Sequence, residues 1–525
     1  MFCGIVIGAS RHGNGNRPRN FLTASMGFLV AVGISGCRPG SRTVERDMSC
    51  SYSRVIHWFR RDLRLTDNTA LYAATQAAEE VITVYITSDW KAHHAWTGPA
   101  RQKFLAGCLS SLEKNVSAAG GLLIFRQGGA VTELERLIQE TRAEAIFYNK
   151  DPDPFGQRVE ATLEKKAAEW GVKVHACKDV VLHERAEVLT GGGKPYRVFT
   201  PYRRNWETLP KPPVLPAVTH LKSPTELHSE PCPTLAAWGL TDSGAALPEA
   251  GERAARLRMK RALSHVIPHY HETRNTPLGE TTSRLSPDLR MGTLSVRELY
   301  HHVVLLAAES GNADVKRSCA TYLSELAWRE FYMQLLWHYP EVLEQEFDPQ
   351  WRGLPWSWEQ KAFQRWKDGL TGFPIVDAGM REARATGQMH NRLRMITAMF
   401  LTKDLRLDWR LGEQYFMQIL IDGEIASNNG GWQWSAGTGA DAAPYFRIQN
   451  PWSQTKSYDP NGDYIRHWVP ELKNAPNAML LEPPGTSSLF AGRFHYPEPM
   501  VNHSEERERT LTFFKKHRET VQRGG

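Results

Sequence analysis

Between residues 54 and 180 the chain alternates short apolar runs with segments whose apolar residues recur about every 3.6 positions. Segments 68–80 and 157–170 are of the second kind, and the apolar runs cover residues 55–59, 81–86, 122–126, 145–148 and 172–175. Short buried strands separated by amphipathic helices are typical of a parallel sheet. The pattern therefore predicts a Rossmann-like α/β domain over residues 54–180, although it lacks the G-x-G-x-x-G and P-loop sequences.

A proline-rich stretch separates this domain from the rest of the chain. Residues 207–250 hold eight of the 31 Pro, with Ser, Thr and Gly between them, so residues 181–251 are predicted to be a long interdomain linker. Residues 252–525 keep an apolar period of about 3.6, as in segments 296–308, 322–338, 359–369 and 373–385. The second half is therefore predicted to be an all-α domain.

Composition narrows the class of protein. With 525 residues, 41% of them hydrophobic, the chain can form two or three compact domains and is unlike a disordered or collagen-like protein. Its 64 Lys+Arg and 57 Asp+Glu give a net charge of +7, and more than half of that excess lies in residues 1–53. A nucleic-acid partner would therefore meet a local basic patch rather than a uniformly basic surface.

The N-terminal extension, residues 1–53, fits neither domain. Basic residues precede an apolar run at 28–34 and then Cys37, which resembles a bacterial lipoprotein signal. The alternative, which we favour, is an unstructured extension or upstream sequence translated from too early a start, with Met26 or Met48 as the initiator. The seven Cys include no C-x-x-C pair, and no run reaches the roughly 18–20 apolar residues that span a bilayer. We expect a cytoplasmic protein without a metal site or membrane contact.

Tryptophan is concentrated in the helical half. Nine of the 17 Trp lie there close together: Trp328, Trp337, Trp351, Trp356, Trp358, Trp366, Trp409, Trp432 and Trp434. Each alone is expected to be a core residue whose N–H needs a partner. As a group, interleaved with Arg, Asn and Gly, they are suited to stacking on bases or on a flavin.

Two polar motifs precede most of these indoles. Residues 282–286 read Thr-Ser-Arg-Leu-Ser and follow Tyr270, so their hydroxyls and cation could bind a phosphate, or could simply cap a helix. Glu325, Trp328 and Arg329 share one helix face by their i, i+3, i+4 spacing. Such a face could hold a heteroaromatic ligand, or could be an exposed ion pair beside a core Trp.

Two further motifs follow. In segment 389–395, Asn391, Arg394 and Met395 fall on one helix face while Arg392 points elsewhere. Segment 421–434 contains two carboxylates, then Asn-Asn-Gly-Gly, then two indoles that flank a Gln. Carboxylates can accept hydrogen bonds from ribose hydroxyls or ring N–H groups, and glycines allow close backbone approach.

Together these motifs resemble the DNA photolyase/cryptochrome family, most closely class I cyclobutane pyrimidine dimer photolyases. The similarity runs from about residue 54 almost to the C-terminus and rests on residues 57–68, 282–286, 328–332, 372–377, 389–395 and 428–434. It implies an antenna-type α/β domain, an α-helical FAD-binding domain, and light-driven repair of dimers by electron transfer from excited reduced FAD. Such an enzyme is a carbon–carbon lyase that acts on damaged DNA, single- or double-stranded, as a monomer.

The resemblance implies a set of cofactor residues in the helical domain. They are Tyr270, Thr282, Ser283, Arg284, Leu285, Ser286, Tyr322, Arg329, Arg394, Asp422, Gly423, Glu424 and Asn428. The residue at Asn428 faces the reactive flavin nitrogen in the family, and plant-type cryptochromes usually have Asp there. Asn avoids placing a second negative charge beside the reduced flavin, which favours repair over signalling.

The resemblance also implies substrate and relay residues. The flipped-out dimer and its backbone would contact Glu325, Trp328, Asn391, Arg392, Met395, Trp434 and Gln454. The catalytic set would be Glu325, Asn391, Met395 and Asn428, and the electron relay from the surface to the flavin would be Trp356, Trp409 and Trp432. Six-four photolyases carry His at the position of Asn391 or Met395, and neither is His here.

Some positions depart from the family pattern. Glu424 replaces the more usual Asp, and Tyr322 stands where some relatives have Trp. Residues 149–158 lack the Asn-Glu pair of relatives that bind a folate antenna, so a deazaflavin, a folate-type chromophore and no antenna all stay open. The competing functions are a cryptochrome-like photoreceptor that signals without repair and a helical nucleic-acid-binding module without redox chemistry. Flavin absorbance of the purified protein would separate the second from the others.

Overall fold

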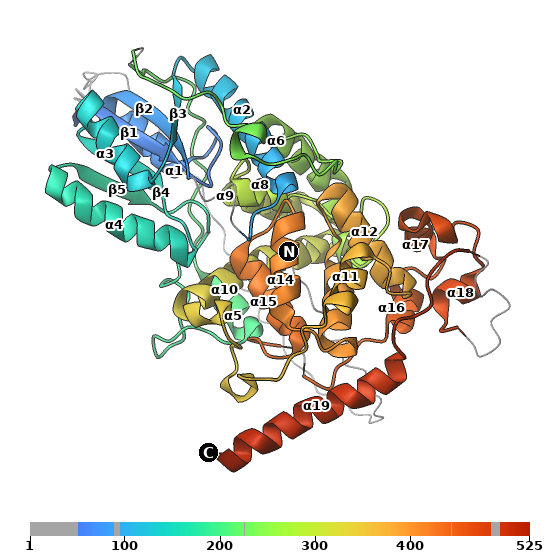
Figure 1. The fold of residues 1–525 in the computed structure, drawn as a ribbon. Helices are drawn as coiled ribbons and strands as arrows, with labels where there is room; N and C mark the ends of the chain where they lie inside the picture. Colours follow the sequence, from blue (N-terminus) through green and yellow to red (C-terminus); the bar gives the residue numbers. More distant parts are fainter. Residues whose placement is uncertain (1–50, 89–94, 225, 443, 485–493, 525) are drawn as a thin grey trace, which may run out of the picture.

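A computed structural model describes residues 51–88, 95–224, 226–442, 444–484 and 494–524 (Figure 1). The signal-like segment and both alternative initiators therefore lie outside the described residues. An α/β domain and a larger helical domain lie side by side, joined by a linker that runs along both (Figure 1). The predicted two-part architecture is confirmed.

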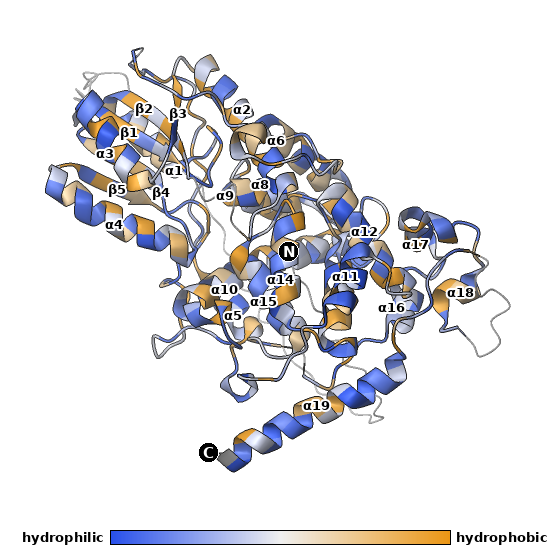
Figure 2. Cartoon of the chain, viewed as in Figure 1, coloured by the Kyte–Doolittle hydropathy of each residue, from blue (hydrophilic) through white to orange (hydrophobic). Residues whose placement is uncertain are grey.

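The α/β domain is built on a five-stranded parallel sheet of order β3-β2-β1-β4-β5. Its strands are β1 (Tyr52–Phe59), β2 (Ala78–Thr87), β3 (Leu123–Gln127), β4 (Ala145–Asn149) and β5 (Lys173–Cys177). Val55 pairs with Val81 on one side and Ala145 on the other. Each strand contains one of the predicted apolar runs or overlaps it. The hydrophobic residues of the strands are orange in Figure 2.

Helices cover both faces of the sheet. Successive side chains of a strand point to opposite faces, so Val55 and Phe59 join one core while Ile56 and Trp58 join the other. The first core is closed by α1 (Thr69–Ala77) and α2 (Pro99–Ala118), and the second by α3 (Ala130–Thr141) and α4 (Pro154–Trp170).

Between β1 and β4 the strand order reverses, and such a point usually forms a ligand crevice at the carboxyl ends of the strands. Here the crevice holds ion pairs. Arg61, just after β1, donates to Asp151 at 2.9 Å and also pairs with Glu424 of the helical domain. The 57–68 motif therefore serves to join the two domains.

A buried charge cluster completes this junction. Arg64 lies 2.7 Å from Asp179, and Arg297 lies 2.8 Å from Asp179 and 3.1 Å from Asp67. Burial alone would raise the pKa of Asp179, but the two guanidinium groups hold that pKa below its usual range. Because each buried charge has a partner of opposite sign, these side chains can stay ionised inside the protein.

Gly292 marks a close approach of the two domains. It ends a helix with φ +69°, and a Cβ there would lie 1.8 Å from the backbone oxygen of Arg61. We expect Gly292→Ala to lower the free energy of unfolding by about 2–4 kcal/mol, because left-handed strain and overpacking add. Gly239, with φ +65° and open space around it, is the matched control, and Gly239→Ala should cost only about 1–2 kcal/mol. Urea unfolding measures both, and equal losses would contradict the close-approach argument.

The linker is partly helical. Its helix α5 (Phe199–Thr208) packs against the helical domain, where Trp206 donates to Glu330 at 2.7 Å. The proline-rich remainder runs extended and is tied to the α/β domain by backbone hydrogen bonds from Val218 to Leu65 and from Leu221 to Ala119. The predicted linker therefore packs against both domains.

The helical domain surrounds the central helix α10, in which every residue from 324 to 336 is buried. No described helix has the length and apolarity needed to cross a membrane. The helices are α6 (Glu252–Arg261), α7 (Tyr270–Thr273), α8 (Ser286–Met291), α9 (Val296–Glu309), α10 (Ala313–His338), α11 (Gln360–Asp368), α12 (Pro374–Thr386), α13 (Asn391–Met399), α14 (Trp409–Ile419), α15 (Ile425–Ala436), α16 (Pro451–Tyr458), α17 (Asp463–Trp468), α18 (Asn477–Leu481) and α19 (His503–Gly524). The last of these is a mostly hydrophilic helix along one end of the domain (Figures 1 and 2).

Candidate active site

Two adjoining hollows in the helical domain collect all the residues predicted to hold the cofactor. The outer hollow is lined by Tyr270, Thr282, Ser283, Arg284, Leu285, Ser286, Leu289, Tyr322, Glu325, Leu326, Glu382, Gln388, Met389, His390, Asn391, Arg394 and Asp422. The inner hollow is lined by Ser286, Arg290, Arg329, Arg394, Leu420, Asp422, Gly423, Glu424, Ser427 and Asn428. They share Ser286, Arg394 and Asp422, so they adjoin at these three residues.

The hydroxyl-rich loop 282–286 is fixed to α10. The hydroxyl of Tyr322 lies 2.9 Å from that of Ser283, and Tyr322 packs edge to face against Tyr270. Arg284 has φ +51°, an uncommon conformation for a residue with a side chain. Its guanidinium donates to Gln388 at 3.2 Å and is half exposed, so a cation stands at the mouth of the site and hydroxyls line its wall.

Arg394 and Asp422 form a buried ion pair where the two hollows meet. Nη2 of Arg394 donates to both carboxylate oxygens of Asp422, at 2.8 and 3.0 Å, and Nε donates to the backbone oxygen of Met389 at 2.9 Å. Burial alone would raise the pKa of Asp422, but Arg394 holds it below its usual range. The pair presents a fixed anion and a fixed cation to a ligand.

The inner hollow ends at Asn428. Its Nδ2 donates to the backbone oxygen of Glu413 at 2.9 Å, so the carbonyl Oδ1 is the atom of this side chain that can accept a hydrogen bond from a ligand. Next to it, Asn429 donates to the Glu413 carboxyl at 2.9 Å, and burial raises the pKa of that carboxyl to about 8. Ser427 Oγ is buried here and has no hydrogen-bond partner among the residues that the structure describes. An unpartnered hydroxyl beside an amide oxygen fits a polar ring system such as a flavin.

The carboxylate of Glu424 has a protein partner at the domain junction. It is paired with Arg61 of the α/β domain and lies 3.9 Å from Arg290. Arg329 likewise reaches the domain junction, where it donates to the backbone oxygen of Val180 at 2.8 Å. Both residues line the inner hollow, and their charged groups bond to residues of the α/β domain. A direct hydrogen bond from a ligand to Glu424 would therefore compete with Arg61.

Glu325 and Asn391 stand at the outer hollow beside the cofactor residues. Glu325 accepts a hydrogen bond from Arg274 at 2.5 Å, and burial raises the pKa of its carboxyl to about 7 although Arg274 opposes the shift. Sequence reasoning missed Arg274. Its spacing of four residues after Tyr270, which places both on one helical turn, was the available signal.

Trp328 is not positioned as a free stacking platform. Phe199 of the linker helix covers its ring at 3.6 Å with an interplanar angle of 9°, and the indole is 5% exposed. A base could stack on this face only if Phe199 moved away. The linker thus contributes a residue at the predicted substrate pocket that the sequence did not reveal.

The other predicted substrate residues lie apart from the two hollows. Arg392 contacts the sulfur of Met395 at 3.8 Å and places its guanidinium over the ring of Tyr458 at 4.4 Å. Met395 and Trp434 are buried, whereas Gln454 is half-buried on α16. These residues come from three helices, so DNA contact by all of them requires a surface wider than the outer hollow.

The three predicted relay indoles lie on a path that leads away from Asn428. Trp432 follows Asn428 by one turn of α15 and packs against Gly412, where any side chain would overlap its ring. Gly412 lies one turn after Trp409 on α14. Trp356 is only 8% exposed, because Phe513 and Phe514 of α19 pack on it. The outer end of the path is therefore covered rather than open to solvent.

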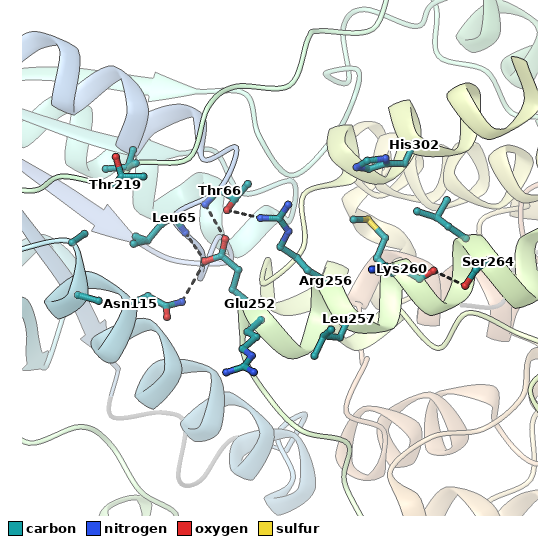
Figure 3. A pocket seen from close by; sticks show the side chains of 16 residues that line it. Leu65, Thr66, Asn115, Thr219, Glu252, Arg256, Leu257, Lys260, Ser264 and His302 are labelled. Atoms are coloured by element: carbon teal, nitrogen blue, oxygen red, sulfur yellow. Dashed lines mark hydrogen bonds between the residues drawn. The ribbon is translucent and has the colours of Figure 1, made fainter. Parts of the chain in front are cut away.

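A more open groove lies between α2, the linker and α6 (Figure 3) and encloses about 1000 Å³. Its buried carboxylate, Glu252, accepts hydrogen bonds from the backbone N–H groups of Leu65 and Thr66 at 2.9 Å. Arg253 and Lys260 on its rim are exposed. Because its buried charge is already satisfied, the groove lacks the converging polar groups of the helical site.

Both halves of the chain match known protein families. Residues 55–219 match the family model of DNA photolyase, and residues 322–516 match that of the FAD binding domain of DNA photolyase. A deoxyribodipyrimidine photo-lyase of Synechococcus sp. is 38% identical over 458 residues, which cover 86% of this chain and 94% of that protein. The chain belongs to the DNA photolyase family.

Solved structures agree with this membership. A class III photolyase of Agrobacterium tumefaciens has a TM-score of 0.83 at 35% identity, over 90% of this chain and 100% of that one. A cryptochrome of Synechocystis sp. has a TM-score of 0.80 at 30% identity, over 88% of this chain and 99% of that one. A photolyase of Sulfolobus tokodaii, described with two FAD molecules, has a TM-score of 0.76 at 29% identity, over 88% of this chain and 100% of that one. The predicted family and fold are confirmed, and photolyases and a cryptochrome share the architecture.

Proposed function

We propose that this protein repairs cyclobutane pyrimidine dimers in DNA by light-driven electron transfer from reduced FAD. The observation that carries the proposal is the composition of the outer hollow. The hydroxyl loop 282–286, Arg394 and Asp422 line it together with Glu325 and Asn391, and it shares Ser286, Arg394 and Asp422 with the inner hollow, which contains Asn428. Cofactor residues and substrate residues therefore border one space. The relatives named as deoxyribodipyrimidine photo-lyases support the same reaction.

The residues present suit FAD. Thr282, Ser283 and Ser286 offer hydroxyls and Arg284 a cation to the phosphates, while Arg394 and Asp422 offer opposite charges to the polar edges. Asn428 Oδ1 and Ser427 Oγ offer hydrogen-bonding groups to the flavin ring. When bound and reduced, FAD supplies on absorbing light the electron that opens the dimer. Burial of the site excludes water from the groups around the ring.

Glu325 and Asn391 are placed to bind the dimer. A dimer stacks and pairs poorly, so it is extruded from DNA at lower cost than a normal base, and a pocket can then read its edges by hydrogen bonds. Glu325 would stabilise the negative charge that develops at the pyrimidine carbonyls, from a position fixed by Arg274. Arg392 and Gln454 are our choices for contacts with the DNA backbone, and Trp434, Met395 and, once uncovered, Trp328 for the apolar wall.

The decisive experiment illuminates the reduced protein with an oligonucleotide that carries one thymine dimer. Recovery of ultraviolet base absorbance measures repair, in single-stranded and double-stranded arms. Loss of the dimer only in the light is the expected result. Bound, reduced FAD without repair would instead favour a photoreceptor, and a colourless protein that still binds the oligonucleotide would favour a binding module.

Further properties belong to the same proposal. We infer a monomer that works in a reducing compartment such as the cytoplasm, which the four free thiols of Cys108, Cys177, Cys232 and Cys319 support. A second, antenna chromophore of deazaflavin or folate type is compatible with this architecture. Light scattering gives the oligomeric state, and the absorbance spectrum after denaturation identifies any second chromophore.

Removing the outer indole should separate photoreduction from repair. We expect Trp356→Phe to slow the photoreduction of oxidised FAD by about tenfold or more, because phenylalanine is far harder to oxidise than tryptophan. Repair by chemically reduced protein should stay unchanged. Trp358→Phe, at an exposed indole two residues away, is the matched control. Unchanged photoreduction in Trp356→Phe would remove Trp356 from the relay.

A further inference from the structure

Two of the three relay indoles share one carboxylate oxygen. Nε1 of Trp356 and Nε1 of Trp409 each donate to Oε1 of Glu346 at 3.1 Å. Glu346 is 2% exposed, so little water competes for this oxygen. A negative charge beside an indole N–H makes loss of an electron from the ring easier, because it stabilises the resulting positive charge.

The loop that carries Glu346 is held in place beside the inner indole. The N–H of Phe347 donates to Gln433 at 2.8 Å, and Gln433 follows Trp432 in α15. Arg352 donates from Nε to the backbone oxygen of Glu346 at 3.0 Å. The carboxylate is therefore preorganised between the indoles and does not have to move when charge arrives.

Arg410 makes the two indoles unequal. Its guanidinium pairs with Oε2 of Glu346 at 3.3 Å, donates to Oε1 at 3.4 Å and lies 3.1 Å from Asp408, so it supplies a counter-charge that two buried carboxylates share. The same guanidinium lies 4.5 Å from the centroid of the Trp409 ring. A cation over a ring favours the neutral ring and opposes loss of an electron from it. Trp356 instead packs against Phe513 and Phe514, so a positive charge is more stable on Trp356 than on Trp409.

We propose that Glu346 is a positioning residue of the electron relay. Its carboxylate stabilises the positive charge that remains on Trp409 and Trp356 when either loses an electron. Arg410 makes that charge less stable on Trp409, so the charge settles on Trp356. The inference rests on the proposed function, since it requires that the three indoles carry electrons to the cofactor.

The step balances as three single-electron transfers. With oxidised FAD bound and excited by light, Trp432 would supply the one electron that the cofactor accepts, Trp409 would return an electron to Trp432, and Trp356 would return one to Trp409. No covalent bond forms or breaks, and each N–H proton stays on its indole. An external thiol finally returns one electron to Trp356.

The test compares Glu346→Gln with Glu344→Gln in the full-length, FAD-loaded protein. Both changes remove one carboxylate from the same loop, but the Glu344 side chain is exposed. After a laser flash on the oxidised protein, transient absorption follows the tryptophan radical. We expect Glu346→Gln to shorten the lifetime of that radical about tenfold, as loss of a charged hydrogen-bond partner implies. Glu344→Gln should match the unaltered protein, and equal lifetimes in all three would overturn the proposal.

A second measurement needs no light-driven chemistry. Ultraviolet resonance Raman spectra, taken in the dark, report the strength of indole N–H hydrogen bonds. Glu346→Gln should weaken the bonds of two indoles, whereas Glu346→Asp, which keeps the charge, should retain the spectrum and most of the radical lifetime. If Glu346→Gln, which keeps the shape, matched the unaltered protein while Glu346→Asp lost the radical lifetime, shape rather than charge would be responsible and the proposal would be overturned.

Different results would contradict the indole relay and the role of Glu346 within it. If Trp356→Phe leaves photoreduction unchanged, the relay itself is wrong. If Trp356→Phe blocks photoreduction but Glu346→Gln does not alter the radical lifetime, only the role of Glu346 is wrong. Repair of a dimer by chemically reduced Glu346→Gln protein should equal that of the unaltered protein, which shows that the fold and the active site are intact.

Discussion

Glu325→Ala is expected to reduce the repair rate about hundredfold at pH 6 while FAD stays bound, as removal of one preorganised donor does in other active sites. The reason is the charge of the reaction. The dimer becomes negative when it accepts an electron, so only the protonated carboxyl can donate a hydrogen bond to it. Burial raises the pKa of Glu325 to about 7, so the donor is present below that pH and is lost as the pH rises through it.

This assignment predicts the pH dependence of three proteins. Repair by the unaltered protein should fall above about pH 7, and Glu325→Gln, which keeps a neutral donor, should remove that fall. Arg274 lowers the pKa of Glu325, so Arg274→Gln should move the fall to higher pH. Single-turnover repair with chemically reduced protein measures all three, with FAD content as the control. A rate that does not change with pH would contradict the role of the protonated carboxyl, and loss of FAD from Glu325→Ala would place Glu325 in the cofactor site.

The elements of the fold could be predicted closely because their signals are local. The apolar run at 55–59 lies inside β1, and the predicted helix at 373–385 is α12 at Pro374–Thr386. Pro374 at the start and Gly387 in the left-handed conformation at the end set these bounds, and both are visible in the sequence.

The partners of charged side chains could not be predicted in the same way. Arg61 and Glu424 are separated by 363 positions, and no local pattern indicates that they meet. The family resemblance predicts a cofactor ligand at Glu424, and only the structure reveals that its carboxylate is also paired with Arg61 across the domain junction. Phe199 over Trp328 is a similar case, because only the packing of the linker helix on α10 brings the two rings together. No local pattern indicates the contact of Glu346 with Trp409 either, since 63 positions separate them.

The ion pair of Arg394 and Asp422 should control both stability and cofactor binding. Arg394→Ala leaves the Asp422 carboxylate buried without its partner, which is expected to lower the free energy of unfolding by about 3–5 kcal/mol. The same change removes a cation from the point where the two hollows meet, so FAD should be lost during gel filtration. Urea unfolding and flavin absorbance measure the two effects. Arg384→Ala, which breaks a surface ion pair between Arg384 of α12 and Asp368 of α11, is the matched control and should cost at most about 1 kcal/mol.

A double variant separates the two effects. Arg394→Met combined with Asp422→Asn removes both charges while it keeps similar volumes, so no buried charge is left unpaired and much of the stability should return. FAD should still be lost, because neither an anion nor a cation remains to hold its polar edges. Recovery of both stability and flavin would mean that the pair acts only as a structural tie, and that the cofactor is held by the hydroxyl loop and Asn428. Recovery of stability without flavin is the outcome expected if the pair is part of the binding site itself.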